Sequence, residues 1–289
     1  MDTKEILKKV RSIEIKTKGL SNHIFAGEYN TAFKGRGMTF SEVREYEIGD
    51  DLRTIDWNVT ARYNSPFVKV FEEEREITLM LMVDVSSSSS FGTNKRFKRE
   101  LVSEISAVLA FSAIKNNDKV GVIFFSDKIE KFISPSKGKK HILRIIKEIL
   151  TFKSSSKKTN IKKALEYFNK VTKKRSVCFL LSDFFDSNYF EPIKLSAKKH
   201  DLIAVNTLDI RELEIPNVGL LCLQDAENEN EIFFDSSERK FREDFKNKQF
   251  FRLATLKKEL RLSGTDYIQL STQEDIISPL IEFFKNRNK

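Results

Sequence analysis

One stretch sets the expectations for the whole chain: Thr78-Leu-Met-Leu-Met-Val-Asp84-Val-Ser86-Ser-Ser88-Ser-Ser-Phe-Gly92. Its apolar run, residues 79–83, is too short to span a membrane and has polar neighbours, which predicts a strand buried on both faces. The strand ends directly at Asp84, and hydroxyl groups follow at alternate positions. Because open α/β sheets bind ligands at the carboxyl ends of their strands, we expect Asp84, Ser86 and Ser88 to converge on one point.

These three side chains offer only oxygen atoms to a ligand. Oxygen ligands suit a hard cation such as Mg²⁺, which takes six oxygens at about 2.1 Å and usually keeps several waters. A serine-rich stretch is more often a solvated loop, so the pattern needs support from the rest of the chain.

The composition indicates a globular protein with a large core. The chain has 289 residues, of which 40% are hydrophobic and 25 are Phe, so we expect one large domain or one domain with an appendage. Cys178 and Cys222 lie far apart in apolar runs, which favours two buried free thiols and a reducing compartment. The chain has neither a signal-peptide pattern at its start nor an 18-residue apolar run, so we expect a cytoplasmic protein without a membrane span.

The positive charge of the chain is concentrated in one stretch. The formal net charge is +9; residues 126–175 hold 16 Lys and Arg against 4 Asp and Glu, whereas residues 1–75 hold 13 of each kind. This surplus predicts a positive face that binds nucleic acid, an anionic lipid surface or an acidic protein. A lysine-rich surface that contacts only solvent is the alternative.

The first quarter of the chain has few apolar residues. Their spacing over residues 2–20 predicts a short helix and then an extended segment, and residues 35–71 interleave Arg, Asp and aromatic residues around Trp57. Since Arg binds carboxylates through two parallel hydrogen bonds, we expect a packed ion-pair network here rather than a polar loop. Residues 1–75 cannot form a core alone, so we predict a structural collar with Trp57 substantially buried.

Strands and helices alternate from residue 67 to the end. We expect strands at 67–71, 79–83, 120–125, 129–133, 177–181, 202–205 and 267–270, and a hairpin of 219–223 with 231–234. We expect helices at 96–114, 141–150, 161–171, 192–199, 237–262 and 276–284, the last after a capping box at 272–275. This order predicts an α/β fold over residues 76–289, with a mainly parallel sheet covered by helices on both faces.

A second strand repeats the pattern of the first. The apolar run at residues 177–181 ends in Ser182-Asp183, and the carboxyl ends of parallel strands lie at the same edge of a sheet. Between the two strands, Thr159-Asn160 precedes a predicted helix. Taken alone, a Thr in that place is usually only a helix cap.

Taken together, Asp84-x-Ser86-x-Ser88, Thr159-Asn160 and Asp183 resemble the metal-ion-dependent adhesion site of von Willebrand factor A domains. The resemblance implies a Rossmann-like fold of that family over residues 76–289 and Mg²⁺ or Mn²⁺ as the cofactor. It also implies that both serines and Thr159 are ligands, and that Asp84 and Asp183 act directly or through water. One coordination position would stay open for an acidic residue of a partner protein.

The upstream sequence resembles a second family, the bacterial "domain of unknown function 58". The resemblance rests on Arg44-Glu-Tyr46, Gly49-Asp50-Asp51-Leu-Arg53-x-Ile-Asp56-Trp57 and Ala61-Arg62. It implies a partner among the MoxR-type AAA+ ATPases, and some members of the family carry membrane segments. Ser90 stands where a Met is often found in the family, but this residue is not an implied ligand.

Common enzyme motifs do not occur in the sequence. The chain has no Gly-x-Ser-x-Gly, phosphate-loop, Gly-x-Gly-x-x-Gly or His-Glu-x-x-His motif, and a haloacid-dehalogenase-like phosphatase would need a carboxylate at Ser86. We expect His23, His141 and His200 to be surface or hydrogen-bonded histidines. The sequence therefore favours a non-enzymatic, metal-dependent protein interaction module. The alternatives are a nucleic-acid-binding protein that uses residues 126–175, which lack interleaved aromatic residues, and a metal-dependent hydrolase.

Thr159 lies inside the basic stretch. Four lysines flank it, and we call them the basic rim: Lys157, Lys158, Lys162 and Lys163. We expect the basic rim to border the metal and to steer an acidic partner surface toward it, an effect that weakens with salt.

Overall fold

The computed structural model describes Ser12 and residues 39–63, 65–72, 77–93, 96–224 and 231–287. The chain divides into two compact units, one of residues 33–77 and one of all other residues. The predictions for residues 2–20 and for His23 lie outside the described residues.

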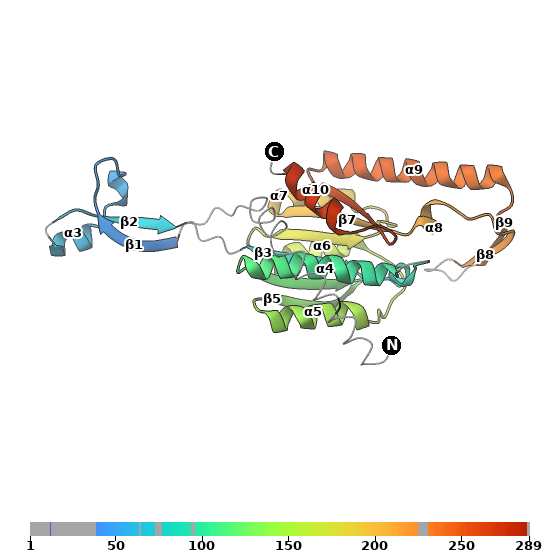
Figure 1. The fold of residues 1–289 in the computed structure, drawn as a ribbon, viewed down its shortest axis with the longest axis horizontal. Helices are drawn as coiled ribbons and strands as arrows, with labels where there is room; N and C mark the ends of the chain where they lie inside the picture. Colours follow the sequence, from blue (N-terminus) through green and yellow to red (C-terminus); the bar gives the residue numbers. More distant parts are fainter. Residues whose placement is uncertain are drawn as a thin grey trace. The chain divides into compact units, whose positions relative to one another are not determined.

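The larger unit contains a six-stranded sheet (Figure 1). Its strands are β3 (Thr78–Asp84), β4 (Lys119–Phe125), β5 (Ile129–Ser136), β6 (Val177–Ser182), β7 (Asp201–Leu208) and β10 (Asp266–Ser271). The strand order is β10-β7-β6-β3-β4-β5, and every neighbouring pair is parallel except β4 with the edge strand β5. The predicted mainly parallel sheet is therefore confirmed.

Helices cover both faces of this sheet. They are α4 (Lys98–Lys115), α5 (Lys139–Thr151), α6 (Ile161–Val171), α7 (Phe190–Lys199), α9 (Arg239–Leu262) and α10 (Ile277–Arg287), with the short η3 (Ser87–Ser90) and α8 (Ile210–Leu213). In Figure 1, α4 and α5 lie in front of the sheet, and α6 and α7 lie behind it. Among the described residues, no helix is both long enough and apolar enough to cross a membrane.

The central strand β3 explains the two layers of helices. Residues 79–82 have no exposed surface and Val83 is 1% exposed. Met80 and Met82 belong to the hydrophobic cluster that includes residues of α6, α7 and α9. Because side chains alternate along a strand, Leu79 and Leu81 point to the opposite face, which α4 covers. A strand buried on both faces has no polar side, which is why it is continuously apolar.

A separate hairpin, β8 (Leu220–Gln224) with β9 (Glu231–Asp235), is antiparallel as predicted. Cys178 in β6 is buried, as expected, but the prediction for Cys222 is wrong because this thiol is exposed. Cys222 lies in β8, and β8 and β9 form a two-stranded sheet outside the six-stranded one. An apolar run in such a hairpin does not have to be buried on both faces.

The smaller unit pairs β1 (Thr39–Glu45) with β2 (Phe67–Glu72) and contains η2 (Leu52–Thr54) and α3 (Trp57–Tyr63). The strand at 67–72 was predicted, whereas β1 was not. The expected ion pairing occurs at Arg44, which donates two hydrogen bonds to Asp50 at 2.8 and 2.7 Å. These hydrogen bonds lower the pKa of Asp50 below its usual value.

The packing predicted around Trp57 is wrong. Trp57 is 71% exposed, and Val68 is the one buried residue among the described side chains of this unit. Helix α3 has seven residues and no buried face, so among the described residues of this unit no apolar layer covers the indole. The assignment of residues 1–75 as a collar stays a prediction.

The predicted capping box at residues 272–275 does not form. Thr272 donates its hydroxyl hydrogen to Asp209 at 2.6 Å instead. Asp275 caps α10, because its Oδ2 accepts from the backbone nitrogens of Ile277 and Ser278 at 3.2 and 3.1 Å.

Candidate functional site

Three neighbouring parallel strands of the sheet each end at an aspartate. Asp84 closes β3, Asp183 follows β6, and Asp209 follows β7. All three are buried, with 6%, 3% and 0% of their surface exposed. Parallel strands place these carboxylates at one edge of the sheet, where open α/β sheets bind ligands.

The serines after β3 turn back toward Asp84. The backbone nitrogen of Ser86 donates to Asp84 Oδ1 at 3.0 Å, and Ser182 donates its hydroxyl hydrogen to Asp84 Oδ2 at 2.7 Å. The hydroxyl oxygens of Ser86 and Ser88 lie 3.1 Å apart. The structure therefore brings Asp84, Ser86 and Ser88 together, because η3 begins at once after Ser86 and folds the chain over the strand end.

Asp183 joins the same cluster from the neighbouring strand. Its Oδ2 accepts from Lys98 Nζ at 2.7 Å, and its Oδ1 accepts from the backbone nitrogen of Phe185 at 3.2 Å. Burial alone would raise the pKa of Asp183, but Lys98, the Ser88 hydroxyl and the Phe185 N–H together lower it. Since Ser88 bonds to Asp183 and lies against Ser86, four of the five predicted ligands form one bonded group.

Asp84 is less well compensated than Asp183. Burial, and then the negative charge of Asp183, raise the pKa of Asp84 to about 6, against a usual value of 3.8. Its hydrogen bonds with Ser86 and Ser182 oppose this rise without cancelling it. The pair of carboxylates therefore has unrelieved repulsion that an added cation would remove.

Sequence reasoning missed the lysine that holds this edge together. Lys98 is the first residue of α4 and is 2% exposed, and its Nζ also donates to Glu212 Oε1 at 2.6 Å. Burial alone would lower the pKa of Lys98, but the charges of Asp183 and Glu212 raise it above its usual value. Lys98 stands in a basic run with Arg96 and Arg99, and such runs are usually solvated, so nothing in the sequence singles it out.

The sequence contains a pattern that could have identified Asp209 and Glu212 as site residues. The strand at 202–205 leads into Asp209, as the other two strands lead into theirs, and Asp209-x-x-Glu212 is a capping-box pattern. The box forms, since the backbone nitrogen of Asp209 donates to Glu212 at 2.8 Å. Asp209 also accepts the hydroxyl hydrogens of Thr93 and Thr272 at 2.8 and 2.6 Å. Donors of this chain thus engage both of its oxygens, which indicates a structural role.

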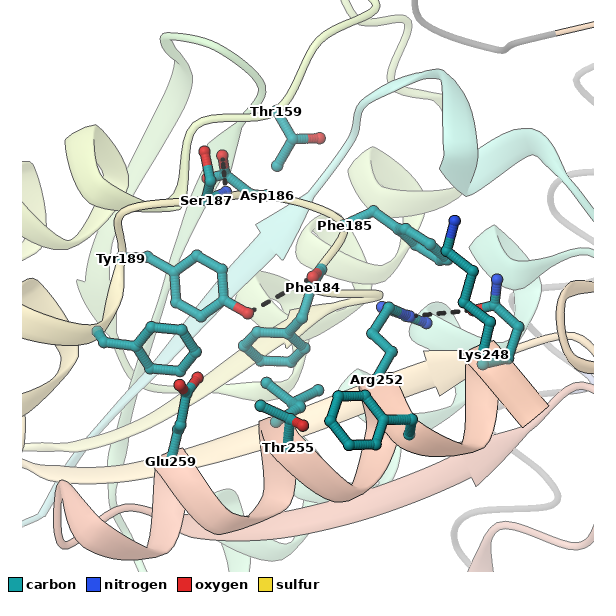
Figure 2. A pocket seen from close by; sticks show the side chains of 14 residues that line it. Thr159, Phe184, Phe185, Asp186, Ser187, Tyr189, Lys248, Arg252, Thr255 and Glu259 are labelled. Atoms are coloured by element: carbon teal, nitrogen blue, oxygen red, sulfur yellow. Dashed lines mark hydrogen bonds between the residues drawn. The ribbon is translucent and has the colours of Figure 1, made fainter. Parts of the chain in front are cut away.

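Thr159 lies on a neighbouring loop rather than within the bonded group. The loop is fixed beside the serines, because the Ser87 hydroxyl donates to Lys157 O at 3.0 Å and the Asn160 nitrogen donates to Ser126 O at 2.9 Å. Thr159 itself is partly buried. It faces the loop after β6 (Figure 2).

The basic rim lies on either side of Thr159. Its four lysines are exposed, although Lys163 Nζ donates to Asp127 O at 3.2 Å. Helix α6 has no acidic residue in its first turn, so Lys162 and Lys163 add their charge to the positive end of the helix dipole. This arrangement strengthens the positive potential at the start of α6.

The donor set has the chemistry that a hard divalent cation requires. No group of three or more His, Cys, Asp or Glu side chains is placed to hold a metal in the described part of the chain, so a metal here would depend on hydroxyls and two carboxylates. Asp84 accepts hydrogen bonds from the backbone nitrogen and side chain of Ser86 and from the Ser182 hydroxyl, and an ionised carboxylate has about four acceptor positions, so one further partner can be accommodated. Mg²⁺ and Mn²⁺ take such oxygen ligands.

A pocket of about 840 Å³ adjoins this site, between the loop after β6 and α9 (Figure 2). Thr159 and residues 184–187 line one side, and Arg252 and Thr255 line the other. The guanidinium of Arg252 lies 3.6 Å from the ring centre of Phe185. Sequence reasoning gave no sign of this pocket, because its walls come from three segments far apart in the chain: Thr159, residues between 184 and 190, and residues between 248 and 259.

We expect the substitution Lys98→Met to destabilise the fold by about 3–5 kcal/mol, because it leaves the buried carboxylates of Asp183 and Glu212 without their cation. Urea unfolding at pH 7 measures the effect. Lys194→Met, at an exposed position of α7, is the control and should change stability by no more than about 0.5 kcal/mol. Adding Glu212→Gln to Lys98→Met should restore part of the loss. If Lys98→Met were as stable as the control variant, the buried charge cluster would be contradicted.

We also predict a pH dependence in protein kept free of metal by a chelator. The folded state raises the pKa of Asp84 to about 6 from a usual 3.8, so it binds this proton more tightly than the unfolded state does. Stability should therefore fall as the pH rises from about 4 to about 6, by about 3 kcal/mol for this group. Asp84→Asn should remove that contribution, and the difference between the two unfolding curves isolates it. Parallel curves for wild type and variant would refute the prediction.

The chain is similar to several known proteins. An uncharacterized protein of Mycobacterium tuberculosis is 26% identical over 294 residues, which cover 100% of this chain and 92% of the relative. The crystal structure of an aerotolerance-related membrane protein from Bacteroides fragilis is similar with a TM-score of 0.50 and 15% identity, over 73% of this chain and 98% of that one. The vWA domain of SpRpn10 is similar with a TM-score of 0.41 and 8% identity, over 72% and 94% of the two chains.

The sequence also matches a family directly. Residues 42–252 match the family described as "Protein of unknown function DUF58". The match begins within β1 and ends within α9, so it includes the upstream block, the three strand-end aspartates and Lys98. The resemblance inferred from the upstream block is confirmed, and this chain belongs to the DUF58 family.

Proposed function

We propose that this protein is a non-enzymatic module that binds a protein partner through a divalent cation. The observation that carries the proposal is the pair of buried carboxylates, Asp84 and Asp183, which converge with serine hydroxyls while the single ammonium of Lys98 neutralises only part of their charge. Asp84, Ser86, Ser88, Thr159 and Asp183 would hold Mg²⁺ or Mn²⁺. The bound cation would supply a positive centre for a carboxylate of the partner.

The chain's own residues orient this site in advance. Ser182 and the Ser86 N–H hold Asp84, while Lys98 and the Phe185 N–H hold Asp183. Ligands fixed by such bonds lose little freedom on binding. A rigid site of this kind suits repeated, reversible docking of one partner group.

The described histidines lie away from the candidate site. His141 bonds to Val120 O near the start of β4, and His200 directly precedes β7, so both lie at the opposite edge of the sheet. His200 also corrects an expectation, because it is buried and neither ring nitrogen has a hydrogen-bond partner among the described residues. Burial, followed by nearby positive charges, lowers its pKa.

The partner that we propose is an acidic surface of a MoxR-type AAA+ ATPase. The family resemblance suggests the ATPase, and the basic rim supports an acidic surface. Exposed lysines at a helix N-terminus raise the association rate of a negatively charged partner without contributing much to affinity. The metal would contribute affinity, and the rim would guide the approach.

Titration calorimetry with Mn²⁺ tests the metal site. Wild-type protein should bind one equivalent with modest affinity, because three of its five ligands are neutral hydroxyls. Asp84→Ala should abolish binding, whereas Glu166→Ala, an exposed carboxylate in α6, should bind as wild type does. Circular dichroism confirms that both variants fold. Equal Mn²⁺ binding by wild type and Asp84→Ala would disprove the site.

Pull-down of the MoxR-type ATPase from the same organism tests the partner. We expect retention that is lost in EDTA and in Thr159→Ala, and that Lys162→Glu with Lys163→Glu weakens most at low salt. Retention that persists unchanged in EDTA would rule out docking through the metal. Metal-independent retention of duplex DNA on the same column would favour the nucleic-acid alternative instead.

A further inference from the structure

The pocket beside the candidate metal site has features that the metal alone does not explain. Thr159, a proposed ligand, lies on its wall, and so does Phe184, the residue directly after Asp183 (Figure 2). A partner group that reaches the cation would therefore have its neighbouring residues at the mouth of this pocket.

The walls of the pocket are rich in aromatic side chains. Phe184 and Tyr189 are each 3% exposed and line its inner side, whereas Phe185 is 43% and Phe251 is 75% exposed. Leu256 of α9 is buried and also lines it. Exposed aromatic groups around a concave apolar surface are typical of a binding site.

One wall of the pocket is positively charged and has a donor to spare. Arg252 donates from Nε to Gln249 at 3.1 Å and from Nη1 to the carbonyl of Asp183 at 3.4 Å. Its Nη2 is buried and has no hydrogen-bond partner among the described residues. Lys248, four residues earlier, also lines the pocket. These groups favour an occupant that carries negative charge and disfavour a basic one.

The acidic residues of the pocket do not reverse this preference. Asp186 is engaged by its own chain, since its two oxygens accept from the backbone nitrogens of Ile161 and Ser187, each at 2.7 Å. Glu259 lies two turns of α9 beyond Arg252, so it is away from the cationic wall. The charge of the pocket is therefore polarised along α9.

The backbone between the two sites is strained. Phe184 has a φ of +55°, an unusual conformation for a bulky residue. The bend buries the ring of Phe184 and turns Phe185 toward Arg252, immediately after Asp183 turns toward Lys98. Strain of this kind persists where the surrounding contacts determine it, and it is concentrated at functional segments.

We propose that this pocket receives a large apolar side chain next to the acidic residue through which the protein partner reaches the metal. The inference rests on the proposed function and specifies the partner segment: an acidic stretch of polypeptide with an aromatic or large aliphatic residue beside the metal-binding carboxylate. The aromatic wall takes the apolar side chain, while Arg252 and Lys248 take further carboxylates of the same stretch. The pocket then supplies selectivity that a cation alone cannot provide.

Fluorescent octapeptides in the presence of Mn²⁺ test the inference. The probes are Gly-Ser-Glu-Phe-Asp-Glu-Ser-Gly, its twin with Asp and Phe exchanged, and the same two peptides with Ala for Phe. At least one Phe peptide should bind about tenfold or more tightly than its Ala twin, the gain expected from burying an aromatic side chain. Equal affinities in both pairs, or no binding of any peptide at millimolar protein, would overturn the inference.

Two pairs of variants in α9 locate the effect. Thr255→Trp fills the pocket and should remove the preference for Phe. Ala254 is exposed, comes directly before Thr255 and lies outside the pocket, so Ala254→Trp should keep the preference. Lys248→Glu should weaken binding several-fold, whereas the control Lys240→Glu, outside the pocket, should not. If both Trp variants changed the preference for Phe equally, or both Lys→Glu variants changed the affinity equally, the peptides would bind at another surface.

The metal site and the pocket can fail separately. Thr255→Trp should bind Mn²⁺ as wild type does, because Thr255 is not a proposed ligand. If wild type binds Mn²⁺ and Asp84→Ala releases the peptides, but Phe and Ala peptides bind equally, the pocket inference is wrong and the metal site stands. If Mn²⁺ does not bind, but Thr255→Trp still removes a preference for Phe, the proposed metal function is wrong and the pocket is supported.

Discussion

The candidate site depends on one buried ion-pair cluster, in which the ammonium of Lys98 bridges Asp183 and Glu212. Burying three charged groups costs several kcal/mol each unless they are paired with good geometry. The bridge meets that condition and connects α4, the loop after β6 and α8. Asp209 extends the connection to the end of β10 through Thr272. The elements around the carboxyl edge are thus held by polar contacts that are too costly to break one at a time.

The same cluster determines what the edge can bind. Lys98 compensates Asp183 from within the protein, while Asp84 is left with a pKa raised to about 6. Two buried carboxylates with no lysine would repel each other strongly, and a lysine for each would leave no charge for a cation to balance. Lys98 is shared between Asp183 and Glu212, so Asp84 keeps a negative charge that a divalent ion could balance, and the serine hydroxyls would add ligands to such an ion without adding charge.

Sequence patterns predicted the parts of the molecule that repeat a simple rule. Residues 79–83 are apolar because β3 is buried on both faces. The aspartates that follow β3 and β6 lie close together because the carboxyl ends of parallel strands share one edge of the sheet. The contacts that sequence reasoning missed are those made by single polar side chains from distant segments. Lys98 reaches Glu212 across 114 residues, and no local pattern records such a pairing. The predictions for Trp57 and Cys222 were wrong for the converse reason, since local composition suggested burial where the described part of the chain leaves both side chains exposed.

The candidate metal site, the basic rim and the aromatic pocket differ in chemistry, and each would meet a different need of the proposed docking site. A cation gives affinity for almost any accessible carboxylate, and lysines raise the association rate of almost any acidic surface. Neither distinguishes one acidic protein from another. Under our proposal shape would do so, because an aromatic pocket next to Asp183 would favour a partner with a large apolar side chain beside its metal-binding carboxylate. The strained backbone at Phe184 then has a physical reason: within two residues the chain must turn one side chain to the charge cluster and another to the pocket.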